Sequence, residues 1–180
     1  FVVCVSLAGS FPVPTAIMAA LTLGLFVYTI GGLSGAHINP AITIALWSIK
    51  KIKTNDAAVY ILVQFIGAVA ALYLSDYLVT RAELTVVDSS YTGLAEGIGA
   101  FFFAFGVAAV VYGKAPKDLS GVVVGGSLLL GISLAASISN GVLNPAVAFA
   151  IGSFSLMYFV GPVVGAVLGM WTFKYISEKK

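Results

Sequence analysis

The sequence predicts an all-α transmembrane protein: a six-helix bundle that also contains two re-entrant half-helices. Of the 180 residues, 60% are hydrophobic and only 9% are charged, and the mean hydropathy is +1.07, which excludes a soluble globular domain. The long apolar runs contain glycine and lack a period-2 alternation, which favours helices over a β-barrel. Finally, Asn-Pro-Ala occurs at residues 39–41 and again at 144–146.

The expected membrane spans follow from the length of the apolar runs. Residues 1–9 are apolar but only half a span long, and neither a basic start nor a cleavage site marks them as a signal peptide. We therefore expect a truncated first helix whose upstream part is missing. Five further runs are long enough to cross about 30 Å of hydrocarbon: residues 16–33, 57–79, 93–113, 119–138 and 155–176.

Each Asn-Pro-Ala tripeptide predicts the start of a half-helix. Proline at the first helical position has no N–H to lose, and the preceding asparagine can cap the free amides of the first turn. Pro40 and Ala41 follow Asn39, and Pro145 and Ala146 follow Asn144. The predicted half-helices, residues 39–49 and 144–152, are too short to cross the bilayer, which suits re-entrant segments.

The two tripeptides belong to an internal repeat. Residues 34–42 align with residues 139–147, and residues 1–5 resemble residues 101–105. The predicted halves are residues 1–79 and 93–177 of a single domain that spans residues 1–180. Each half contains three crossings, so the second half enters from the opposite side of the membrane, as in an inverted-topology repeat with its site at the midplane.

The basic residues predict the orientation. With six spans, eight of the nine fall on one face, and only Arg81 lies opposite. The positive-inside rule makes that face, and with it the C-terminus, cytoplasmic, and a plasma or inner membrane is expected. The eight lysines follow the first half-helix, separate the fourth and fifth spans, and close the chain: Lys50, Lys51, Lys53, Lys114, Lys117, Lys174, Lys179 and Lys180.

Two half-helices that enter from opposite faces place their N-termini together at the membrane centre. Each N-terminus carries about half a positive charge, so a cation there is repelled and loses its hydration, whereas neutral molecules escape both penalties. Asn39 and Asn144 can donate hydrogen bonds to a passing oxygen. The backbone carbonyls expected to line the passage as acceptors are those of Gly35, Ala36, His37, Asn140, Gly141 and Val142.

These residues resemble the major intrinsic protein family, the aquaporins and aquaglyceroporins. Residues 34–43 read Ser-Gly-Ala-His-Ile-Asn-Pro-Ala-Ile-Thr, and the second Asn-Pro-Ala, Gln64 followed by Gly67, and Glu96 at the start of the fourth span complete the pattern over the whole chain. The resemblance implies a single channel domain embedded in membrane lipid and assembled as a homotetramer, which passes water and small neutral solutes passively.

The sequence departs from the family at the second constriction. Most members carry an arginine three residues after the second motif's asparagine, where this chain has Val147. The other three filter positions correspond to Ala19, Ile132 and Gly141, so all four are small or apolar. This combination resembles members that pass boric acid, glycerol or urea. A water-selective or poorly conducting channel, in which Ile132 and Val147 dewet the pore, and an ion-coupled transporter that uses Glu96 are the alternatives.

The remaining polar residues are expected to brace the loops. A carboxylate inside an apolar span must find donors, so Glu96 is expected to hold the second loop, with a proton relay as the competing role. Gln64 is expected to bond loop backbone. His37 is the single histidine and Cys4 the single cysteine, so no metal or cofactor is expected. No enzyme signature is present, and the scattered lysines give nucleic-acid binding no support.

Overall fold

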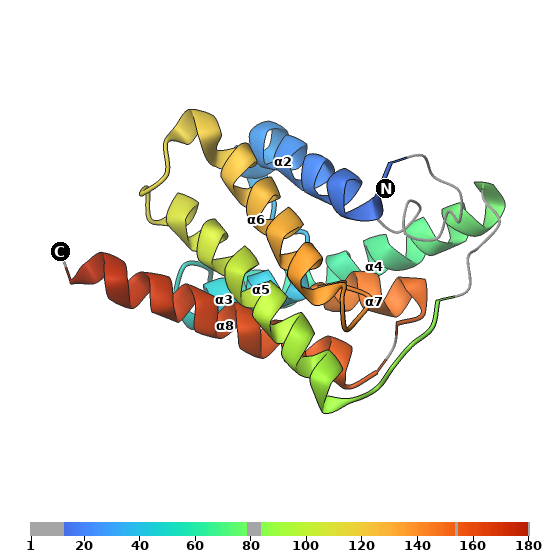
Figure 1. Ribbon diagram of the computed structural model, residues 1–180. Helices are drawn as coiled ribbons and strands as arrows, with labels where there is room; N and C mark the ends of the chain where they lie inside the picture. The colour runs from blue at the N-terminus through green and yellow to red at the C-terminus, as the bar shows by residue number, and fades with distance from the viewer. Residues whose placement is uncertain (1–12, 79–83, 154, 180) are drawn as a thin grey trace.

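A computed structural model describes residues 13–78, 84–153 and 155–179, and all regular structure in these ranges is helical (Figure 1). Five of the helices are long and apolar enough to cross a membrane. Each corresponds to one of the five predicted full spans, while the predicted truncated helix at residues 1–9 lies outside the described residues. The five are α2 (Thr15–Ser34), α4 (Thr54–Leu78), α5 (Ser90–Val111), α6 (Ser120–Ala135, preceded by the 3-10 turn η1, Lys117–Leu119) and α8 (Met157–Glu178).

Two helices are too short to span a bilayer. Helix α3 (Pro40–Ser48) has nine residues and α7 (Pro145–Ile151) has seven, and both begin at the proline that the tripeptides predicted. Helix α7 ends at Gly152, which adopts a left-handed conformation with φ of 85° that costs glycine nothing. Both half-helices therefore start on a local sequence signal, and α7 also ends on one.

The helix ends differ from the predicted spans by a few residues, for local reasons. Helix α5 begins three residues early because the hydroxyl of Ser89 caps it, accepting a 3.2 Å hydrogen bond from the Thr92 N–H. Helix α6 ends at Ala135 instead of residue 138. There the Ser139 N–H still bonds the Ala135 carbonyl at 2.9 Å, and the chain then turns away so that the Ser139 hydroxyl reaches Glu96.

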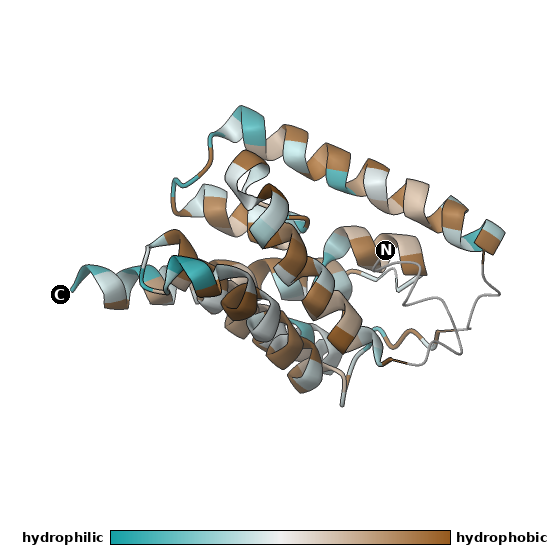
Figure 2. Ribbon diagram, turned by 90° about the horizontal axis from the view of Figure 1, so that it is seen from above, coloured by the Kyte–Doolittle hydropathy of each residue, from teal (hydrophilic) through white to brown (hydrophobic). Residues whose placement is uncertain are grey.

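Helix packing depends on close backbone approach. Helix α5 packs between α8 and α6, α2 packs on α6, α3 on α8, and α4 on α7. A Cβ added at Gly165 of α8 would collide with the backbone of Gly97 in α5, and one at Gly131 of α6 would collide with the carbonyl of Gly99. Small residues of this kind let membrane helices approach closely. Figure 2 shows hydrophobic residues along the helices and hydrophilic ones gathered at the end where the C-terminus lies.

The two loops that lead into the half-helices share the same local structure 105 residues apart. The Ser34 hydroxyl accepts a hydrogen bond from the Ala36 N–H at 3.3 Å, and the Ser139 hydroxyl accepts one from the Gly141 N–H at 3.0 Å. The residues that directly precede each asparagine both have positive φ, 49° for Ile38 and 54° for Leu143. The sequence repeat is thus also a repeat of hydrogen bonds and backbone angles.

Candidate functional site

Asn39 and Asn144 cap the two half-helices. The side-chain oxygen of Asn39 accepts a 2.8 Å hydrogen bond from the Ala41 N–H, and that of Asn144 accepts bonds from the N–H groups of Ala146 and Val147 at 3.1 and 3.4 Å. Each cap satisfies amides that a helix start leaves without partners. Because the oxygen is committed to the cap, the NH₂ group of each asparagine must point away from its own half-helix.

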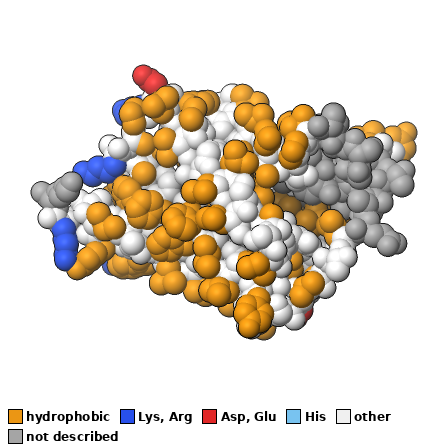
Figure 3. All heavy atoms as spheres, viewed as in Figure 1, with side chains coloured by type: hydrophobic (Ala, Val, Ile, Leu, Met, Phe, Trp, Pro, Cys, Tyr) orange, Lys and Arg blue, Asp and Glu red, His pale blue; other side chains and the backbone are white. Residues whose placement is uncertain are grey.

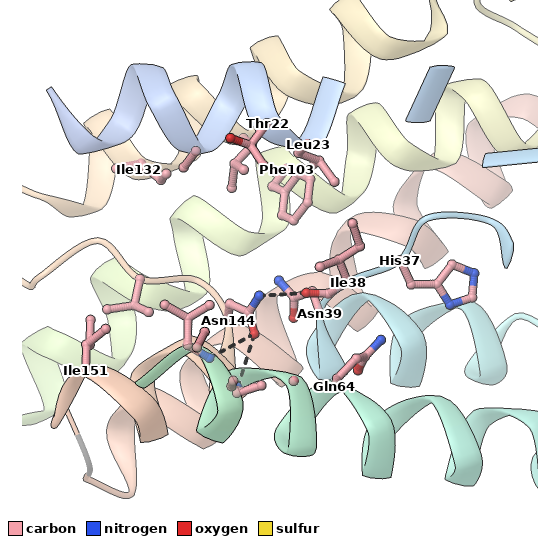
Figure 4. A pocket seen from close by; sticks show the side chains of 18 of the residues that line it. Thr22, Leu23, His37, Ile38, Asn39, Gln64, Phe103, Ile132, Asn144 and Ile151 are labelled. Atoms are coloured by element: carbon pink, nitrogen blue, oxygen red, sulfur yellow. Dashed lines mark hydrogen bonds between the residues drawn. The ribbon is translucent and has the colours of Figure 1, made fainter. Parts of the chain in front are cut away.

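The NH₂ groups of the two asparagines tie the loops to each other. Nδ2 of Asn39 donates to the Leu143 carbonyl at 2.8 Å. Nδ2 of Asn144 donates to the Ile38 carbonyl at 2.9 Å, the bond drawn between them in Figure 4. Each acceptor directly precedes the opposite asparagine, so the half-helices meet N-terminus to N-terminus. A side-chain amide has two N–H donors, which leaves one on each asparagine beyond this crossed pair of bonds.

The crossed bonds depend on an unusual backbone at Ile38 and Leu143. A positive φ is costly for these side chains, about 1–2 kcal/mol for a residue in the left-handed helical region. The cost is met because the conformation presents each carbonyl to the opposite asparagine. Neither residue was among the predicted site residues. Both directly precede the asparagine of a repeated motif, and this equivalence could have identified them from the sequence.

Glu96 holds the second loop from inside helix α5. It is fully buried, and its carboxylate accepts hydrogen bonds from the Ser139 hydroxyl at 2.7 Å and from the N–H groups of Val142 and Leu143 at 2.9 and 2.6 Å. The Leu143 N–H belongs to the residue whose carbonyl receives Asn39, so the carboxylate and the crossed pair share one peptide segment. This is the arrangement that loop-bracing requires.

A second clamp holds the two ends of α7 and was not predicted. The Asn140 backbone N–H donates to the Tyr158 hydroxyl at 2.9 Å, and its side-chain NH₂ donates to the Ser153 hydroxyl at 2.8 Å. Tyr158 and Ser153 are both buried. Asn140 precedes α7 and Ser153 follows it, so the half-helix is tied at both ends. Nothing in the local sequence pattern indicated this pairing.

Thr43 organises the polar side chains around the first half-helix. Its hydroxyl accepts a 3.0 Å hydrogen bond from Nε2 of Gln64, donates to the Asn39 carbonyl at 3.0 Å, and lies 3.3 Å from Nδ1 of His37. The His37 ring also lies against the ring of Tyr60, with centroids 5.1 Å apart. Gln64 was expected to bond loop backbone, but its hydrogen bond goes to a side chain of the half-helix.

The asparagine pair lies on the wall of a cavity of about 770 Å³. In Figure 4, Ile132 and Ile151 lie toward one end, His37 and Gln64 toward the other, and the asparagines between them. All four predicted filter residues line this cavity: Ala19, Ile132, Gly141 and Val147. Of the other residues expected to offer carbonyls, four line it and Gly35, the left-handed end of α2, does not: the four are Ala36, His37, Asn140 and Val142.

The wall opposite the asparagines is mostly apolar, with Thr22 of α2 as a polar member (Figure 4). Leu23 of α2 and Phe103 of α5 lie across the cavity from Asn39 and Asn144 (Figure 4), and Phe103 is almost completely buried. Two predicted filter residues also lie close together. A Cβ built on Gly141, whose φ is 60°, would lie 3.3 Å from the side chain of Ile132. The same Cβ would lie 3.0 Å from the Ile132 carbonyl oxygen, so glycine lets this loop pack closely against α6.

Five membrane-length helices, two half-helices that meet at capped N-termini and a cavity beside them define a helical membrane channel. Residues 9–175 match the family model described as major intrinsic protein, and the chain belongs to that family. It is therefore an integral multi-pass membrane protein, a channel for water and small solutes, and not an enzyme.

Curated relatives agree with the family match. The chain is 32% identical to Aquaporin AqpM of Methanothermobacter thermautotrophicus over 177 residues, which cover 85% of this chain and 72% of that protein. It is 33% identical to Probable aquaporin AqpM of Archaeoglobus fulgidus over 183 residues, covering 89% and 74%. Nodulin-26 of Glycine max is 28% identical over 174 residues, covering 89% and 64%.

Proposed function

We propose that the protein is a passive channel for small uncharged solutes of the glycerol, urea or boric acid class, with water passing as well. The observation that carries the proposal is the composition of the predicted filter. Ala19, Ile132, Gly141 and Val147, the four predicted filter residues, line the same cavity as the asparagine pair. None carries a charge, and the largest are an isoleucine and a valine.

The charge distribution supports neutral solutes. Among the described residues that line the cavity there is no aspartate, glutamate, lysine or arginine, so a cation finds no counter-charge there. The amides at the starts of α3 and α7 face the same region, and their partial positive charge opposes cations. A neutral molecule meets neither obstacle, and narrow channels use both effects to select.

The chemistry of the two walls supports small hydroxylated or amide solutes. One wall offers an N–H of each asparagine and the nearby carbonyls as hydrogen-bond partners, and the other offers Leu23 and Phe103. A polyol carries hydroxyl groups on one face and C–H groups on the other, so it satisfies both walls at once. Water uses the polar wall alone, and the relatives named aquaporins support it as a permeant.

The proposal includes a homotetramer with the C-terminus in the cytoplasm of a plasma or inner membrane. The family resemblance supports the tetramer, and the lysines at one end support the orientation. The two halves, residues 1–79 and 93–177, are proposed as an inverted repeat, supported by the matching hydrogen bonds 105 residues apart. Mass measurement of the purified complex and protease access to the C-terminus in sealed vesicles test the tetramer and the orientation.

Stopped-flow light scattering on proteoliposomes tests the transport proposal. Vesicles with protein should swell in glycerol, urea or boric acid faster than empty vesicles and should also respond faster to an impermeant osmolyte. Fast water flow with all three solutes rejected would identify a water-selective channel. No flux through folded protein would identify a closed or poorly conducting one, and flux that saturates and follows an ion gradient would identify a coupled transporter.

A further inference from the structure

One end of the molecule carries a concentration of unpaired positive charge. Among the described residues, seven lysines lie in the segments that follow α3, join α5 to α6, and end α8, against two acids in the same segments, Asp118 and Glu178, and Asp56 in the first turn of α4. None of these lysines forms an ion pair with a described residue. Figure 3 shows lysine side chains projecting from this end, beyond a surface that is otherwise mostly hydrophobic.

Three of the described lysines lie over aromatic rings, and two of these pairs lie close to the end of α3. Nζ of Lys51, just after α3, lies 4.4 Å from the ring centre of Tyr112 at the end of α5. Nζ of Lys174 lies 4.6 Å from the ring centre of Trp171 in α8. Tyr112 in turn contacts Phe173, which precedes Lys174, with ring centres 6.0 Å apart. We call Lys51, Tyr112, Trp171 and Lys174 the lysine–aromatic patch.

The patch is joined to the pore-forming half-helix. The indole N–H of Trp171 donates a 3.1 Å hydrogen bond to the hydroxyl of Ser48, the last residue of α3. The patch therefore brings together the ends of α3, α5 and α8. Stacking holds each ammonium group over one ring face, which leaves N–H donors on its other side.

An apolar stripe on α8 leads from the membrane to the patch. Val164, Leu168, Trp171 and Tyr175 recur at three- and four-residue spacing, and all four are exposed. The Lys179 ammonium extends the positive charge beyond Tyr175, whose ring centre lies 4.1 Å from it. A ligand that follows this surface needs hydrocarbon along the stripe and negative charge at its end.

We propose that the lysine–aromatic patch binds the phosphate of an anionic phospholipid, with an acyl chain along the α8 stripe, and thereby holds the end of α3. Interfacial aromatic residues place the lysines at the depth of the headgroups. The unpaired lysines supply the charge complementarity, and the apolar stripe selects a lipid over free phosphate. The inference concerns the outer surface and does not depend on which solute the cavity passes.

Fluorescence quenching by brominated lipid tests the proposal. The chain has two tryptophans, Trp47 and Trp171, so W47F leaves Trp171 as the single reporter. In phosphatidylcholine vesicles, a minor fraction of brominated phosphatidylglycerol should quench Trp171 more than the same fraction of brominated phosphatidylcholine. Each lysine at a membrane surface enriches anionic lipid by about fivefold, so adding K51Q and K174Q should remove most of the excess, whereas K51R and K174R should keep it.

Matched controls separate this patch from general charge. K114Q with K117Q removes the same charge from the segment between α5 and α6, where no lysine lies over a ring in the described structure, and the excess should persist. Circular dichroism verifies that each variant is folded. Equal quenching of Trp171 by the two brominated lipids would overturn the proposal. So would loss of the extra quenching by brominated phosphatidylglycerol in the K114Q/K117Q variant, which keeps Lys51 and Lys174. So would competition by inorganic phosphate beyond that of chloride at equal ionic strength.

Discussion

Asn39 and Asn144 are cross-linked by hydrogen bonds, each donating to the carbonyl of the residue that precedes the other. Because each side-chain oxygen also caps its own half-helix, one carboxamide fixes both the start of a helix and the position of the opposite loop. Neither half-helix can shift along its axis without breaking both crossed bonds. The polar face of the cavity is thus held rigidly at its centre.

Replacing Asn144 with aspartate should weaken the crossed pair and the cation barrier together. The carboxylate keeps the capping oxygen but loses the hydrogen bond to the Ile38 carbonyl, a net loss of about 0.5–1.5 kcal/mol of unfolding free energy. It also places negative charge where the helix starts repel cations. Proteoliposomes that contain a pH-sensitive dye should show faster proton entry. Asn55→Asp, the same change at the exposed start of α4, should behave as the unmodified protein does.

Glu96→Gln should destabilise the second loop. The glutamine side chain has one oxygen that can accept a hydrogen bond, but an NH₂ group takes the place of the second carboxylate oxygen. That NH₂ group would face the N–H of Val142 or Leu143 and leave it without an acceptor, at a cost of about 1–3 kcal/mol. Unfolding followed by circular dichroism in detergent measures the change. Glu178→Gln removes the same charge from an exposed residue at the end of α8 and serves as the control. Equal stability of the two variants would show that the carboxylate does not brace the loop.

Val147→Arg should narrow the cavity and add a fixed charge to its lining. We expect glycerol and boric acid permeability to fall by about tenfold, equivalent to about 1.4 kcal/mol in the barrier, while water flow falls less because water is smaller. Val147→Gln adds comparable length without charge and separates the steric effect from the electrostatic one. Stopped-flow swelling measures both variants, and unchanged solute flux in Val147→Arg would remove Val147 from the proposed filter.

Leu84 adds a further side chain to the same end of the cavity. It lies in the segment before α5, lines the cavity and packs with Ala146 and Ile151, whereas Val87 in that segment is exposed and does not line it. Leu84→Ala should therefore raise the permeability of four-carbon polyols relative to glycerol. Val87→Ala also truncates an apolar side chain, but at a residue that does not line the cavity. It should leave the ratio of four-carbon polyol to glycerol permeability unchanged.

Gly165→Ala should separate α5 from α8. The added Cβ would meet the backbone of Gly97, which cannot rotate away as a side chain could, so we expect a loss of about 1–3 kcal/mol. Gly126→Ala in α6 is the matched control, because a Cβ there meets nothing within 4 Å. Alanine favours a helix by about 0.5–1 kcal/mol over glycine, so the control should be neutral or slightly more stable in thermal unfolding.

Local sequence was sufficient for the helices and the half-helix starts. The five full spans follow from the length of apolar runs, and the starts of α3 and α7 follow from an asparagine cap and a proline at the first helical position. These features depend on neighbours in the chain, which a sequence displays directly. The four filter positions came instead from the resemblance to the family, and all four line one cavity.

Tertiary structure alone decided which polar groups pair. Gln64 bonds Thr43 instead of loop backbone, and Tyr158 bonds Asn140, because these partners depend on how the half-helices lie against α4 and α8. Trp171 bonds Ser48 across 123 residues of chain. A hydrogen bond requires both a short distance and a suitable direction between donor and acceptor. The residue pattern within one segment specifies neither quantity relative to a segment far away in the chain. The residue pattern therefore determined the helices and the short re-entrant segments, and packing decided their contacts.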